Sequence, residues 1–216
     1  MESNTLQNIL KRAIDIFLSL AVIIGFIPIW IGIAILIKTT STGPVFFLQD
    51  RPGKYRKIFK VFKFRTMVPG SEKMIKGQEV MKDDDRIVPV GRFLRRTKLD
   101  EIPQLLNVLM GEMSIVGPRP ERVASLEDYD DEISKRLNMK PGITGLAQVS
   151  GNIYLDLSER YRFDVFYVEH FSLWLDVRII FRTIGVIFFG EEYYAKMPLV
   201  TLTENSKDSR KESAQA

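Results

Sequence analysis

The chain has 216 residues, 45% of them hydrophobic and 27% charged, and its 31 basic and 27 acidic residues leave a net charge of +4. This length fits one domain with a sizeable core, and the absence of cysteine excludes disulfides and thiolate metal sites. The modest positive charge favours an anionic membrane surface or substrate. Without a basic stripe interleaved with aromatic residues, we expect no nucleic-acid partner.

The first distinctive segment is the apolar run 13–37, whose only charge is Asp15. It is too long for a signal peptide and lacks a small-residue cleavage site. As a straight helix it would extend roughly 37 Å, enough to span a bilayer core of about 30 Å. Pro28 lies at its midpoint and predicts a kink, with two arms of roughly 20 Å that are each too short to cross. The segment is therefore either a spanning anchor or a re-entrant hairpin, and the basic residues at both ends favour two cytoplasmic flanks.

Two strands are predicted next, over 44–50 and 57–65, with a turn around Arg51-Pro52-Gly53. The period of two places Lys63 and Arg65 on one face. These cations form either an anion-binding edge or a charged strand edge that opposes aggregation. The polar stretch 72–85 ends in three aspartates, but no second set of ligands accompanies them, so a solvated loop is expected.

The acidic pair Asp100–Glu101 follows a run of cations that includes Arg95. Adjacent carboxylates at a helix start either complement the helix dipole and cap free N–H groups or belong to a phosphate-handling site. The apolar spacing that follows predicts a buried helix ended by Gly111.

Arg119 lies between two prolines in Gly117-Pro118-Arg119-Pro120. The prolines fix the backbone on both sides, which suits either a plain turn or a guanidinium positioned for bidentate phosphate contacts. The glycine-rich segment 140–151 matches neither a P-loop nor a Rossmann fingerprint, although its backbone amides could face a ligand.

The aromatic-rich region 161–189 carries Arg178 and Arg182 four residues apart. A helix here is expected either at the membrane interface or in the core. His170, the only histidine, is expected to be incidental, and the polar residues 203–216 are expected to form a disordered tail.

Several motifs in one order resemble the bacterial sugar transferases called monotopic phosphoglycosyl transferases, from about Ile9 to Tyr194. These motifs are Lys11-Arg12 with Asp15 before the proline-broken apolar segment, 60–67 (KVFKFRTM), 99–104 (LDEIPQ), 117–120 (GPRP) and 141–149 (PGITGLAQV). Family members commonly have Ser directly before the membrane proline, whereas this chain has Ile27. Gly25 and Gly32 could allow adjustment there.

The resemblance implies an α+β, mostly helical fold with a small β-hairpin and interfacial amphipathic helices. The implied organisation is an N-terminal cytoplasmic segment 1–10, a re-entrant membrane helix 11–38 broken at Pro28, a catalytic domain 39–195 and a disordered tail 196–216. Both termini would lie in the cytoplasm, at the inner leaflet of the bacterial plasma membrane. Such enzymes begin capsule, O-antigen, exopolysaccharide or glycoprotein pathways.

The resemblance further implies that Asp100 is the nucleophile and that Glu101, with Asp100, holds Mg²⁺. Lys63, Arg95 and Arg119 match basic positions that bind substrate phosphates. We expect Asp100 to attack the β-phosphate of a UDP-sugar and release UMP, and polyprenyl (undecaprenyl) phosphate to take the phosphosugar from the aspartate.

The residue chemistry agrees with this expectation, because a carboxylate is ionised at neutral pH and attacks phosphorus without a general base. Two rivals remain open. One is a non-catalytic membrane-anchored scaffold or lipid-binding protein. The other is a multi-spanning transferase, which the single apolar segment disfavours.

Overall fold

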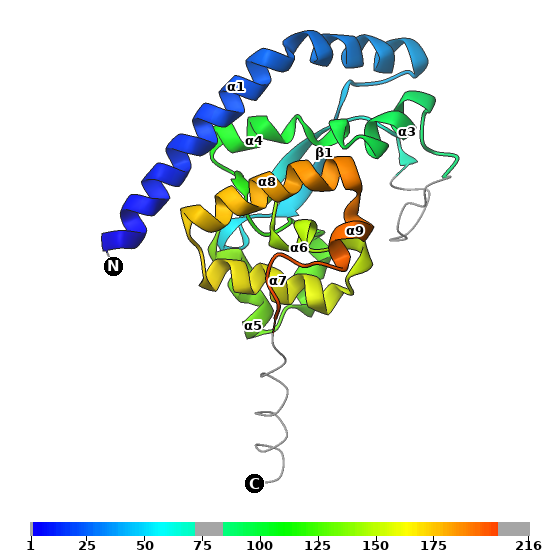
Figure 1. Cartoon of the computed structure of the whole chain (residues 1–216). Helices are drawn as coiled ribbons and strands as arrows, with labels where there is room; N and C mark the ends of the chain where they lie inside the picture. Colours follow the sequence, from blue (N-terminus) through cyan, green and yellow to red (C-terminus); the bar gives the residue numbers. More distant parts are fainter. Residues whose placement is uncertain (1, 72–83, 203–216) are drawn as a thin grey trace.

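The computed structural model describes residues 2–71 and 84–202, with side chains from Thr5 onward (Figure 1). The segment 72–83 and the tail 203–216, and with them most of the expected loop and of the expected tail, lie outside the described residues. The described part is mostly helical with two small sheets, which confirms the α+β prediction. The helices of four or more residues are α1 Glu2–Thr40, α3 Pro89–Arg96, α4 Gln104–Met110, α5 Asp131–Ser134, α6 Leu146–Val149, α7 Leu157–Glu169, α8 Leu173–Phe189 and α9 Glu191–Ala195, with 3-10 segments η3 Val123–Asp128 and η4 Lys135–Asn138.

The long helix α1 is continuous across Pro28. Figure 1 shows it changing direction partway along without reversing, so the predicted kink is present as a bend. The boundary predicted at residue 11 is not a break in secondary structure, because α1 starts at Glu2. Among the described residues α1 is the one helix long and apolar enough to cross a membrane, by length and composition alone, and little of its apolar stretch is buried. Its topology stays a prediction.

Both arms of α1 are attached to the rest of the protein. Beyond the proline, Ile33 and Ile37 pack with Phe64 and Leu94. Near its start, Lys11 is only 8% exposed, and its Nζ donates to Asp176 Oδ2 at 2.6 Å and to the Val116 carbonyl at 2.9 Å. The charges before the apolar run therefore have partners within the protein.

The predicted hairpin is confirmed as β1 Phe46–Pro52 paired antiparallel with β2 Ile58–Phe64 through the 3-10 turn η1 Lys54–Arg56. The side chains of Lys63 and Arg65, however, bind different partners. Lys63 reaches Glu101, whereas Arg65 donates to the Thr42 carbonyl and to Ser41 in the link that follows α1. Of the two alternatives, an anion-binding edge shared by both side chains is therefore not formed.

A second sheet joins β3 Ser114–Val116 to β4 Gly142–Thr144 in parallel. The backbones of Gly117 and Gly142 lie too close together for a side chain at either position. A Cβ on Gly142 would come within 2.1 Å of the Gly117 nitrogen. The Gly142 N–H donates to the Pro118 carbonyl, and the Gly117 N–H donates to the Thr144 carbonyl. The glycine-rich segment thus holds the loop that carries Arg119, so these amides are not available to a ligand.

The main core lies between β3, α6, α7 and α8 and includes Leu146, Phe163, Tyr167 and Ile179. Each fully buried side chain of this kind contributes about 1.5–3 kcal/mol. Helix α7 starts with a capping box between Asp156 and Glu159.

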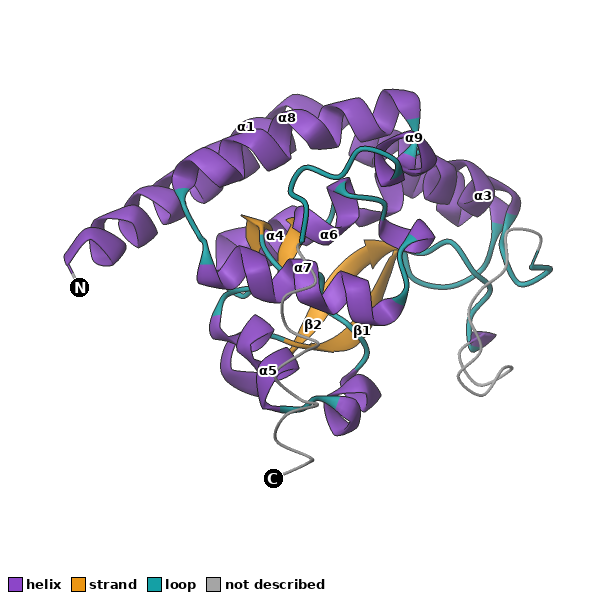
Figure 2. Cartoon of the chain, turned by 60° about the horizontal axis from the view of Figure 1, so that its bottom comes forward, coloured by secondary structure: helices purple, strands orange, loops and turns teal. Residues whose placement is uncertain are grey.

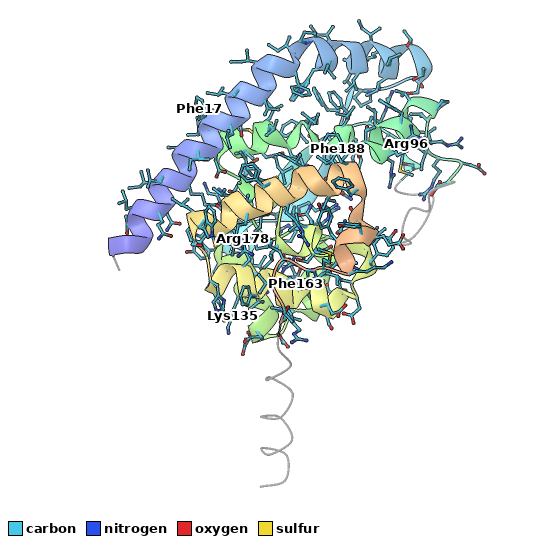
Figure 3. All side chains as sticks on the ribbon, viewed as in Figure 1. Phe17, Arg96, Lys135, Phe163, Arg178 and Phe188 are labelled. Carbon is cyan, nitrogen blue, oxygen red and sulfur yellow. The ribbon has the colours of Figure 1, made fainter. Side chains whose placement is uncertain are left out.

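Helix α8 is buried only along one side. Many of its apolar side chains are exposed, including Phe188, labelled with α1 residue Phe17 in Figure 3. Figure 2 shows α1, α8 and α9 along one side of the molecule, with the strands in the middle and α5 on the opposite side. His170 directly follows α7, and its ring stacks on Phe166. No hydrogen bond, ion pair or ring contact among the described residues joins it to the site described below.

Candidate active site

The acidic pair lies in η2 Leu99–Glu101, a short 3-10 turn between α3 and α4. Lys98 enters this turn in the left-handed conformation, with φ of 58°. Neither η2 nor α4 has a side-chain hydrogen bond at its cap position, so the capping interpretation of the carboxylates has no support. Helix α4 and its end at Gly111, with φ of 82°, confirm the predicted helix.

Glu101 is held by two cations from separate segments. Its Oε1 accepts from Lys63 Nζ of β2 at 2.8 Å and from Arg119 Nη2, in the loop after β3, at 3.3 Å. Burial by itself would raise the pKa of Glu101, but the two cations outweigh it and hold the pKa well below its usual range. Glu101 is therefore ionised throughout the physiological pH range.

Asp100, its neighbour, is in the opposite situation. Among the described residues, no hydrogen bond or ion pair engages its carboxylate. Burial, followed by the charge of Glu101, raises the pKa of Asp100 to about 6, against the opposing cations Lys63, Arg95 and Lys98. At pH 7 it is about nine-tenths ionised and more basic than an ordinary carboxylate. Two adjacent acids thus have pKa values that are pushed far apart, as at many catalytic sites.

The predicted phosphate-binding residues divide into two groups. Lys63 and Arg119 contact Glu101 directly, whereas Arg95 acts on Asp100 electrostatically without an ion pair in the described structure. Arg95 lies in the last turn of α3, just before the acidic turn. Cations therefore flank the dyad from three elements, an arrangement suited to a substrate that carries several negative charges.

The donor set fits Mg²⁺ in part. The described residues contain no cluster of three or more His, Cys, Asp or Glu side chains. Mg²⁺, however, commonly takes only one or two carboxylates and completes its shell with water and substrate phosphates. Asp100 and the second oxygen of Glu101, Oε2, have no hydrogen bonds in this part of the structure and could supply those carboxylates. Of the three consecutive aspartates, Asp84 is engaged by Arg86, and Asp83 lies outside the described residues.

Three further residues, which no sequence pattern indicated, support the site. Arg136, almost completely buried, donates to the Arg119 carbonyl at 2.8 Å and pairs with Asp164. Glu191 of α9 pairs with Lys98 at 3.3 Å and so ties α9 to the acidic turn. Arg51, at the end of β1, interacts electrostatically with Arg119 and Glu101. The only local signal was the cationic character of the two arginines, since their partners are distant in sequence.

Comparison with known proteins gives a consistent family. The family described as "Bacterial sugar transferase" matches residues 6–190. The chain is 42% identical over 201 residues to a UDP-glucose:undecaprenyl-phosphate glucose-1-phosphate transferase of Klebsiella pneumoniae, covering 88% of this chain and 43% of that protein. It is 41% identical over 188 residues to a UDP-N-acetylgalactosamine-undecaprenyl-phosphate N-acetylgalactosaminephosphotransferase of Aeromonas hydrophila, covering 84% and 44%.

The chain thus spans less than half the length of these two relatives. A shorter relative, the exopolysaccharide production protein PSS of Rhizobium leguminosarum bv. phaseoli, is 42% identical over 187 residues that cover 82% of this chain and 94% of that protein. The family match includes the acidic turn, the hairpin and the Arg119 loop. The chain belongs to the bacterial sugar transferase family.

Proposed function

We propose that this protein transfers a sugar-1-phosphate from a UDP-sugar to polyprenyl phosphate through a phosphosugar bound covalently to Asp100. The observation that carries the proposal is the asymmetry of the dyad. Glu101 is fixed and ionised by Lys63 and Arg119, whereas Asp100 has no hydrogen-bond partner in the described structure and a raised pKa. The names of the Klebsiella pneumoniae and Aeromonas hydrophila relatives include a UDP-sugar and undecaprenyl phosphate, which supports the substrate class.

In the first step an Asp100 carboxylate oxygen forms a bond to the β-phosphorus of the donor. The bond between that phosphorus and the bridging oxygen breaks, and UMP leaves with the electron pair. No general base is needed, because Asp100 is mostly ionised at neutral pH. The main obstacle is repulsion between a carboxylate and a diphosphate, which Lys63, Arg95 and Arg119 offset. Mg²⁺, held by Asp100 and Glu101, would add positive charge at the phosphate oxygens.

In the second step the phosphate of polyprenyl phosphate attacks the same phosphorus and displaces Asp100, giving a polyprenyl diphosphosugar. This acceptor is a lipid, so the site must lie near a membrane surface. Helices α1 and α8 lie along one side of the molecule in Figure 2, and both carry exposed apolar side chains, which suits such a location. We propose that α1 is re-entrant at the inner leaflet and that both termini are cytoplasmic.

The decisive experiment compares wild type with Asp100→Asn in detergent, with a UDP-sugar labelled in its β-phosphate. Without acceptor, wild type should retain up to one label per chain and release a matching amount of UMP. Asp100→Asn should retain none, and its steady-state turnover should fall by at least about a thousandfold. Asp128→Asn, at an exposed position, is the matched control.

Full turnover by Asp100→Asn would eliminate the nucleophile assignment. UMP release by neither protein, over a panel of UDP-sugars with Mg²⁺ and polyprenyl phosphate, would favour a scaffold instead. For the topology, cysteines introduced near each end of the chain should both react only with reagents that reach the cytoplasm. Labelling of either end from outside would show that α1 spans.

A further inference from the structure

Arg51 is a cation beside the site that the proposed reaction has not used. It occupies the second-last position of β1 and is half-buried. Its hydrogen bond goes to a neutral group, with Nη2 donating to Gln49 Oε1 at 2.8 Å. No carboxylate in the described structure forms an ion pair with it. A partly buried guanidinium without an anionic partner is unfavourable unless a ligand supplies the negative charge.

The chain places Arg51 next to the Arg119 loop. The two residues after it, Pro52 and Gly53, line a narrow cavity together with the segment Pro118–Glu121. Strand β1 also packs against η3, which follows that segment. Arg136 fixes the other side of the loop through the Arg119 carbonyl. The guanidiniums of Arg51 and Arg119 are thus carried by two backbone segments that are packed together, a rigid arrangement for two anion-binding groups.

The local charges also favour an anion at this place. Burial, followed by the positive charges of Arg119 and Arg122, lowers the pKa of Arg51 to about 10, although Glu121 and Glu101 partly oppose the shift. An oxyanion between the guanidiniums would relieve both the repulsion and the lost hydration.

The contacts around the site indicate which anion this is. Asp100 adjoins Glu101 in the acidic turn, and Glu101 pairs with Arg119 at 3.3 Å. Arg119 in turn lines a cavity with Pro52, the residue that follows Arg51. A diphosphate with one phosphorus at Asp100 would extend its other phosphate toward Arg51.

We propose that Arg51, together with Arg119, forms the subsite for the nucleotide phosphate that leaves the donor, the phosphate of UMP. This inference rests on the proposed function for the identity of the ligand, because the geometry alone specifies a phosphate or diphosphate. Arg51 acts as a binding residue for the leaving group, beside the loop that carries Arg119.

The test measures binding of UMP and of inorganic pyrophosphate to the full-length chain by calorimetry, in wild type, Arg51→Gln, Arg51→Lys and Arg56→Gln. Arg56 is the matched control, since it lies on the same hairpin and loses the same charge. Among the described residues its side chain makes one hydrogen bond, an exposed one to Ser134. Arg51→Gln should weaken both ligands by about 10–100-fold, the range for a lost charge-assisted hydrogen bond. Arg51→Lys should fall between, because lysine keeps the charge but not the planar fork.

Thermal unfolding of each variant shows whether it folds, and Arg51→Lys keeps the test valid if Arg51→Gln does not. Arg51→Gln binding both ligands as well as Arg56→Gln would overturn the subsite. Pyrophosphate binding that depends on Arg51, with no UMP binding by wild type, would support the anion site while refuting a uridine nucleotide as donor. A KM for the UDP-sugar that rises in Arg51→Gln, with an unchanged KM for polyprenyl phosphate, would place the subsite on the donor side.

Discussion

Replacing the proposed nucleophile should make the folded protein more stable. The folded pKa of Asp100 is about 6, against an ordinary value of 3.8, because burial and Glu101 disfavour its ionised form. Between these two pH values the unfolded chain has released the proton while the folded chain still holds it. Ionisation of Asp100 therefore destabilises the fold as pH rises above about 4, and the penalty is complete above about pH 6.

The size of this penalty follows from the shift of about two pKa units. At 1.36 kcal/mol per unit, the charged Asp100 costs about 2–3 kcal/mol of unfolding free energy at pH 8. Asp100→Asn removes the charge with little change in shape, so it should recover most of this energy, or several degrees in Tm for a chain of this size. Below about pH 4 the gain should vanish, because both states of wild type are then protonated.

The assay is thermal unfolding in detergent from pH 4 to 8, with Asp128→Asn as an exposed control. A gain for Asp100→Asn that is equal at pH 4 and pH 8 would refute the electrostatic reasoning, as would no gain at pH 8. A stabilising loss of charge together with a large loss of turnover would be typical of a functional residue that is retained at the expense of stability.

Three other predictions follow from the same geometry. The kcat/KM for the donor should fall at acid pH with an apparent pKa near that of Asp100, about 6. Glu101→Gln should move this acid limb to lower pH, since the charge of Glu101 raises the pKa of Asp100. Initial rates at saturating acceptor measure the pH profile of each protein. Arg136→Met should reduce the unfolding free energy by about 3–5 kcal/mol, since it leaves the buried carboxylate of Asp164 without its cation; chemical denaturation measures it. Gly142→Ala should lower Tm and the yield of folded protein, because its Cβ would overlap the facing strand.

Each of these predictions has a contrary result. An acid limb that does not move in Glu101→Gln would mean that the limb reports a group other than Asp100. A small effect of Arg136→Met would show that Asp164 finds another partner. For the glycine, Gly25→Ala is the control, because an added Cβ there meets nothing within 4 Å, and equal effects at both positions would contradict the steric argument.

Local patterns predicted several elements correctly. The alternation of residues around Arg51-Pro52-Gly53 predicted the hairpin, and the apolar spacing before Gly111 predicted α4, since both signals depend on neighbours a few residues apart. The same alternation also placed Lys63 and Arg65 on one face, but it did not predict that their long side chains would turn to different partners. Strand periodicity fixes where a side chain starts, whereas the surrounding packing decides where its charged end lies.

The bend of α1 shows a similar division. Pro28 predicted a kink because it removes a backbone hydrogen bond, and the sequence left open whether the helix reverses or only changes direction. In the structure it changes direction, and the part beyond the proline packs through Ile33 and Ile37 on Phe64 and Leu94. The outcome depends on contacts with β2 and α3, which no local pattern contains.

By itself, the sequence determined the hairpin, the long apolar segment with its proline, and the residue types of the acidic dyad, because these depend on composition and short-range spacing. The class of fold came from the family resemblance of its ordered motifs. Only the tertiary structure decided how the two acids differ. Lys63 and Arg119, which are 38 and 18 residues from Glu101 in the sequence, both bind its carboxylate. None of the described residues pairs with Asp100. The pKa of a carboxylate depends on burial and on charges within a few ångströms, and folding brings those charges together from distant parts of the chain.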